Sequence, residues 1–225
     1  MRYYLLLLML WTLPAQGSGF DSAMRAYQNQ QYEYALEAFK SLAAQGDADA
    51  QHRLAVMYRH GQGVEQNNKT ALRWYKKAAD NGHLKAQTSA AAMLYFAIGT
   101  PADWDQAAHY FSLAAQQGDA KAQESYGLML LQGEGGAQNS KKAALWLNMA
   151  AAQDQARAQL ALGMLHLAGE GVRRSETAGL IWIEKSALAN HKPAQWALYK
   201  TYSDGLYGQA ANQERASYWQ RRYQH

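Results

Sequence analysis

Residues 48–83 read ADAQHRLAVMYRHGQGVEQNNKTALRWYKKAADNGH, and the pattern of this segment returns every 36 residues along the rest of the chain. An Ala-Gln dipeptide marks each return without any shift in register: Ala50-Gln51, Ala86-Gln87, Ala122-Gln123, Ala158-Gln159 and Ala194-Gln195. A fixed period of about 20 to 50 residues is typical of solenoids, in which each unit buries its apolar face only against its neighbours. The repeat therefore predicts an extended surface and not a single deep pocket.

Each unit reads as two helices joined by a glycine turn. In the quoted segment, apolar residues follow helical spacing over residues 50–58 and again over residues 71–79. Gly61 and Gly63 lie between these two stretches, and glycine ends a helix by entering the left-handed region without steric cost. Strand signals are nearly absent, since β-branched runs are few and the chain has only three prolines. We therefore predict an all-α fold.

Three series of equivalent positions carry more local expectations. Polar residues that can accept hydrogen bonds from first-turn amides predict N-caps for the second helices, at Asn67, Asp103, Asn139 and Ser175. Small residues in the first helices predict a close approach of the partner helix, at Ala55, Ala91, Gly127 and Gly163. The second helices end at Gly46, Gly82, Gly118, Asp154 and Asn190. Because Asp and Asn tolerate the left-handed conformation best after glycine, we predict that conformation at all five positions.

The N-terminus differs from the repeat. Residues 1–19 combine Arg2, an apolar run over residues 5–13 and the small residues Ala15 and Gly17, which predicts a cleavable secretory signal with cleavage after Gly17 or Gly19. The apolar run is shorter than the ~20 residues that a membrane-spanning helix needs. We therefore expect an exported protein without stable membrane insertion after cleavage. The periplasm is the leading expectation for its location, and secretion or display on the cell surface are the alternatives.

The remaining chain divides into six helical pairs. Residues 20–47 are expected to form a capping hairpin, followed by five repeats over residues 48–83, 84–119, 120–155, 156–191 and 192–225. The composition, with 48% hydrophobic residues in 225, is that of a folded protein. The chain has no cysteine, which excludes disulfides and thiolate chemistry, and its net charge of +4 is too small and too dispersed to indicate nucleic-acid binding.

The combined pattern is Ala-x-x-x-Leu-(Gly/Ala)-x-x-Tyr-x-x-Gly-x-Gly-Val, followed by Ala-x-x-Trp-Tyr-x-x-Ala-Ala-x-x-Gly. It resembles the Sel-one-like repeat, a relative of the tetratricopeptide repeat, and residues 50–64 and 71–82 match it nearly throughout. The resemblance implies a right-handed α/α superhelical solenoid of 36-residue helix-turn-helix units, with the first helix of each unit on the concave side. It also implies an adaptor that assembles complexes, and exported bacterial members are associated with envelope regulation, surface polysaccharide, motility or host contact.

A partner-binding groove follows if tetratricopeptide geometry applies. The candidate groove residues are the first-helix positions that the consensus does not use: His52, Val56, Arg59, His60, Thr88, Tyr95, Phe96, Glu124, Leu128, Leu131, Gln132, Leu160, Met164, Trp196 and Lys200. The first concave position of each unit is charged, at Asp49, Lys85, Lys121, Arg157 and Lys192. An apolar centre with charged ends suits a docked peptide or helix. The alternative is that Leu128, Leu160, Met164 and Leu167 are buried between repeats.

The residues indicate no catalytic, cofactor or metal site. His52 and His60 lie eight residues apart, but no third ligand at a suitable spacing accompanies them. The glycine turns lack the preceding strand and the spacing of a phosphate-binding loop. We therefore expect a non-catalytic scaffold for a protein or peptide partner. One alternative is β-lactam binding or hydrolysis, as linked to cysteine-rich relatives, although the chain lacks cysteine and a Ser-x-x-Lys element. Another is a surface protein that binds polysaccharide or a host molecule.

Overall fold

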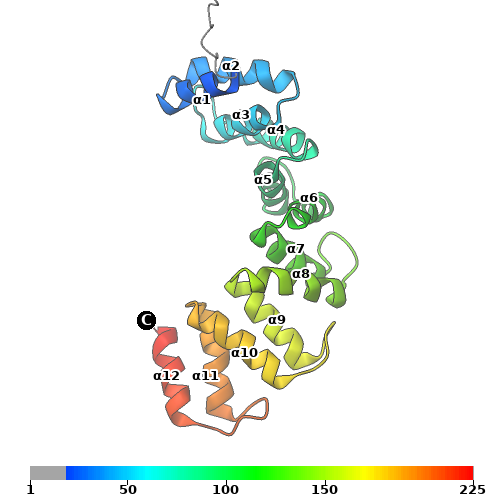
Figure 1. Ribbon diagram of the computed structural model, residues 1–225, viewed down its shortest axis with the longest axis vertical. Helices are drawn as coiled ribbons and strands as arrows, with labels where there is room; N and C mark the ends of the chain where they lie inside the picture. The colour runs from blue at the N-terminus through cyan, green and yellow to red at the C-terminus, as the bar shows by residue number, and fades with distance from the viewer. Residues whose placement is uncertain (1–18, 225) are drawn as a thin grey trace, which may run out of the picture.

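The structure is a computed structural model that describes residues 19–224, and within this range it contains twelve helices and no strands. The helices pack as consecutive pairs, and each pair also packs against the next, which gives the elongated array of Figure 1. This confirms the predicted all-α solenoid of repeated helix pairs. The helices are α1 (Gly19–Gln28), α2 (Tyr32–Ala44), α3 (Ala48–His60), α4 (Asn68–Asp80), α5 (Leu84–Tyr95), α6 (Trp104–Gln116), α7 (Ala120–Gln132), α8 (Ser140–Ala152), α9 (Ala156–Ala168), α10 (Glu176–Leu188), α11 (Lys192–Asp204) and α12 (Gln213–Gln224).

The predicted signal peptide lies outside the described residues, apart from Gly19 at the start of α1. Among the helices of residues 19–224, none combines the length and the apolar character that crossing a membrane requires.

Side chains cap the helices as the sequence predicts. The side chains before α4, α6, α8 and α10 each accept a hydrogen bond from the backbone N–H three residues later, which confirms the four predicted N-caps Asn67, Asp103, Asn139 and Ser175. The first helices use the same device at Asp47, His83 and Asp119, where His83 accepts through its ring Nδ1. Each cap satisfies one otherwise unpaired first-turn amide.

The left-handed positions are also confirmed. Asp154 and Asn190 follow the second helices with φ of 59° and 62°, as Gly46, Gly82 and Gly118 do with φ between 84° and 92°. The backbone therefore needs this conformation even where glycine has been replaced. Ala97 has φ of 57° at the position where the quoted segment has Gly61, so the same requirement holds where the turn has alanine at this position.

Small residues in the first helices allow the helix pairs to approach closely. Ala55 and Ala91 are fully buried, and a Cβ added to Gly163 would lie 2.8 Å from the carbonyl oxygen of Gly179 on the partner helix α10. A side chain at Gly163 would therefore push two helix backbones apart. The predicted close approach is confirmed at these positions.

The glutamine of each Ala-Gln pair forms a buried link between units. In all five, the side-chain Nε2 donates to the backbone carbonyl eight residues earlier, near the end of the preceding second helix, at 3.1 or 3.2 Å. The Oε1 of Gln123 accepts from Gln153 Nε2 at 2.8 Å, and Gln51 and Gln87 are satisfied in the same way by Asn81 and Gln117. Gln51, Gln87 and Gln123 thus each join the ends of two successive second helices.

This ladder is interrupted in the fourth unit. Ala189 stands where the earlier units have Asn81, Gln117 and Gln153. Within residues 19–224, the buried Oε1 of Gln159 has no hydrogen-bond partner, and neither has that of Gln195 in the fifth unit. The backbone at Ala189, with φ of −75° and ψ of 15°, is close to that of Asn81, with φ of −84° and ψ of 13°. A longer amide side chain at Ala189 is therefore expected to reach Gln159.

Completing the ladder should stabilise the protein. We expect Ala189→Gln to raise the free energy of unfolding by about 1 kcal/mol, because a buried acceptor gains its missing hydrogen bond. Urea unfolding measures the difference. Ala189→Met is the matched control, since it adds a side chain of similar length without an amide. Equal stability of the two variants would show that the orphaned Oε1 carries no penalty.

Candidate functional site

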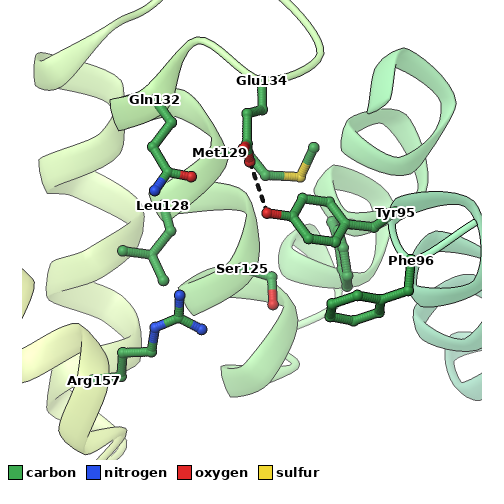
Figure 2. Close-up of a pocket in the computed structure, with 9 residues that line it drawn as sticks. Tyr95, Phe96, Ser125, Leu128, Met129, Gln132, Glu134 and Arg157 are labelled. Carbon is green, nitrogen blue, oxygen red and sulfur yellow. Dashed lines mark hydrogen bonds between the residues drawn. The ribbon is translucent and has the colours of Figure 1, made fainter. Parts of the chain in front are cut away.

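A cavity of about 190 Å³ lies where the second, third and fourth repeats meet (Figure 2). The last residue of α5 and the residue that follows it are aromatic, and α7 forms one wall. The turn after α7 and the start of α9 contribute one charged residue each. The lining residues are Tyr95, Phe96, Phe111, Ser125, Leu128, Met129, Gln132, Glu134 and Arg157. Three successive units therefore supply a single site.

Polar groups of opposite charge lie at two sides of the cavity. The Tyr95 hydroxyl donates to Glu134 Oε2 at 2.9 Å, and this hydrogen bond raises the pKa of Tyr95. On the other side, the Arg157 guanidinium points toward Ser125 and Leu128 (Figure 2). Among residues 19–224, no hydrogen bond or ion pair engages this guanidinium, although its positive charge acts on Tyr95 and on Glu124.

Phe96 stands at the rim of the cavity with 67% of its surface exposed. It follows the last residue of α5, and its ring packs edge-on against Tyr95 with the ring centroids 4.9 Å apart. Scattered exposed hydrophobic residues are normal on protein surfaces. Phe96 differs from a scattered residue because it continues the apolar lining of a cavity.

The structure brings together part of the predicted groove. Tyr95, Phe96, Leu128 and Gln132 line the cavity, together with Arg157 from the charged series. Met164 and Trp196 are exposed but lie outside the cavity, and the rings of Trp196 and Tyr223 are 5.4 Å apart. The predicted residues His52, Arg59, His60, Thr88 and Lys200 also lie outside it, and Lys200 pairs with Asp204 at 2.6 Å.

Four predicted groove residues serve the packing of the fold. Val56, Leu131 and Leu160 are half-buried against the core clusters between helices. Of the four leucine and methionine residues in the alternative interpretation, Leu167 is buried, Leu128 and Leu160 are half-buried against a core cluster, and Met164 is exposed. Glu124 accepts a hydrogen bond from the Ala158 N–H at 3.2 Å, which caps the start of α9 where Gln155 makes no side-chain cap. Burial raises the pKa of Glu124.

Sequence reasoning missed Ser125, Glu134 and the two largely buried residues Phe111 and Met129. Glu134 lies between the turn glycines Gly133 and Gly135, so its position indicated only a backbone role. The structure has a parallel contact in the first unit, where Gln62, in the equivalent turn, accepts a hydrogen bond from the Tyr27 hydroxyl. The residue between the paired glycines can thus accept a hydrogen bond from a tyrosine hydroxyl of the preceding helix pair.

A second cluster of titratable groups lies between the first two repeats. The rings of His52 and His83 stack with centroids 4.3 Å apart, and His83 Nε2 lies 3.2 Å from Asp49 Oδ1. Since His83 Nδ1 accepts the Ala86 N–H, its Nε2 carries the proton that is donated to Asp49. Burial, with the neighbouring His83, Arg53 and Lys85 adding to it, lowers the pKa of His52 to about 4. No group of three or more His, Cys, Asp or Glu side chains in residues 19–224 is arranged to hold a metal ion.

Comparison with known proteins agrees with the repeat pattern. The Sel1 repeat family matches residues 48–83, 84–119, 120–155 and 156–191, which together make up more than half of the chain. No curated protein shows significant sequence similarity to the chain.

Two solved structures share both fold and sequence features with this chain. A Sel1 repeat protein from Oxalobacter formigenes is 28% identical with a TM-score of 0.78, over 92% of this chain and 82% of that protein. A protective antigen present in uropathogenic Escherichia coli strains, displaying an SLR fold, is also 28% identical with a TM-score of 0.78, but this chain covers only 45% of it. An immunity protein from Pseudomonas aeruginosa shares the fold alone. It is 18% identical with a TM-score of 0.50, over 95% of this chain and 84% of that protein.

The half-buried His52 ring predicts a loss of stability in acid. Its pKa is about 4 in the folded chain and about 6.5 when unfolded, so the unfolded chain binds more protons between these values. The free energy of unfolding should therefore fall as pH decreases from about 6.5 toward 4. Urea unfolding at pH 7 and pH 5 measures this. Burial also lowers the pKa of His83 and of His191, so we expect His52→Gln to reduce the dependence and the control His60→Gln, exposed on the same helix, to keep it. An unchanged dependence in His52→Gln would contradict the assignment.

Proposed function

This chain belongs to the Sel1 repeat family, whose scaffold-type fold typically mediates protein interactions, and we propose that it binds a segment of a partner protein at the cavity beside Phe96. The observation that carries the proposal is the exposed aromatic ring at the rim of an apolar cavity. Aromatic residues that fill or flank pockets are enriched among the residues that dominate binding energy at protein interfaces.

The variability of the site within the repeat supports the proposal. The position of Phe96 holds a different residue in every unit: His60, Phe96, Gln132, Ala168 and Asp204. The fold therefore sets no requirement for an aromatic residue there. An exposed phenylalanine that folding does not need is better explained by contact with a partner.

We also propose that the chain acts as a non-catalytic adaptor in the bacterial envelope. The signal-like character of residues 1–19 supports export, and the repeat fold supports a scaffold. Cell fractionation, with the mass of the mature N-terminus, tests the location. We expect to find the chain in the envelope fraction, with a mature N-terminus that begins after Gly17 or Gly19. An uncleaved chain confined to the cytoplasm would overturn this part of the proposal.

Charge at the rim of the cavity should abolish partner capture. The native chain is crosslinked to its neighbours in envelopes, and the crosslinked proteins are isolated with it. We expect the Phe96→Asp variant to capture far less of these proteins, because burying its carboxylate against an apolar partner group carries a desolvation cost. Quantitative mass spectrometry of the captured proteins measures the loss.

Tyr34→Asp is the matched control, since Tyr34 is an aromatic residue of nearly the same exposure, 66%, on the remote helix α2. Both variants should keep the thermal melting temperature of the native chain. Identical captured sets from the two variants would overturn the proposed site.

A further inference from the structure

The cavity beside Phe96 has the size of one large side chain. A dry cavity of about 150 Å³ accommodates benzene, so the 190 Å³ here holds an aromatic or a large aliphatic group. Most of its wall is apolar, from Phe96, Phe111, Leu128 and Met129. A partner segment would therefore place one apolar side chain in it.

Two charged side chains line this cavity, the carboxylate of Glu134 and the exposed guanidinium of Arg157. Arg157 lines the cavity and has no hydrogen bond or ion pair within residues 19–224. The two carboxylates near the site are already engaged: Glu134 accepts from the Tyr95 hydroxyl, and Glu124 accepts from the Ala158 N–H. A planar guanidinium favours a carboxylate, which it can bind through two parallel hydrogen bonds.

We infer that the segment bound here carries a large apolar side chain next to an acidic residue, with the apolar group in the cavity and the carboxylate on Arg157. This inference rests on the proposed function and adds the chemistry of the partner. A basic residue placed next to Arg157 would face a like charge, which works against binding, and Glu134 on the other side of the cavity already accepts the Tyr95 hydroxyl. The site thus selects among apolar segments by the charge of the neighbouring residue.

An array of short peptides tests the inference with the full chain. Each peptide has serine and glycine flanks, and its two central positions are varied over all pairs of amino acids. We expect the native chain to capture pairs of a large apolar and an acidic residue about tenfold better than pairs of a large apolar and a basic residue. Arg157→Glu should reverse this preference. Lys141→Glu, the same charge change at an exposed residue outside the cavity, should retain it.

The outcomes separate the inference from the proposed function. Capture that is lost in Phe96→Asp but is indifferent to the acidic neighbour, or equal behaviour of Arg157→Glu and Lys141→Glu, would overturn the inference and leave the proposed site standing. Capture of no peptide at all, or capture that Phe96→Asp does not reduce, would overturn both. Melting temperatures within the range of the native chain exclude unfolding as the cause in each variant.

Discussion

The buried glutamine of each Ala-Gln pair is the interaction on which the order of the array depends. A buried amide is costly unless its donors and acceptor are paired, so the glutamine tolerates only one placement of the two helix ends around it. In the first three units it joins a carbonyl of the preceding second helix to a side chain at the end of the next one. The bond from the glutamine Nε2 to the preceding second helix recurs in all five units, which explains why the dipeptide keeps its register over the whole array.

A fixed register has a functional consequence. Because the repeated residues hold each unit in the same relation to its neighbours, a residue that departs from the repeat can change the surface without changing the fold. The cavity beside Phe96 is built in this way: α5, α7 and α9 hold equivalent places in three units, but contribute Phe96, Leu128 and Arg157. The residues that give this cavity its shape and charge therefore lie at positions that do not repeat.

Most of the fold could be predicted from the sequence because its signals are local. The caps at Asn67 and Ser175 and the left-handed conformation at Asp154 depend on side-chain type and on spacing within one helix end. The glutamine link could not be derived in the same way. Gln123 finds its partners in residues 115 and 153, and only the stacking of helices brings these together.

The candidate site was predicted in part for the same reason. Tyr95, Phe96, Leu128 and Gln132 lie on the helix faces that the repeat leaves unused, so their place could be inferred. Glu134 enters the cavity from a glycine turn, and its contact with Tyr95 crosses from one unit to the next. The hydrogen bond of Glu124 to the start of α9 could not be predicted, because the two residues come together only when the following unit is in place.

A double-mutant cycle between Gln123 and Gln153 tests the central role of the glutamine link most directly. Their side chains share a hydrogen bond of 2.8 Å, and Gln123→Leu, Gln153→Ala and the double variant remove it singly and together. Urea unfolding of the four proteins gives the coupling energy. We predict a coupling of about 1 kcal/mol, since the two residues are in direct contact. Effects that add to within about 0.3 kcal/mol would contradict the account.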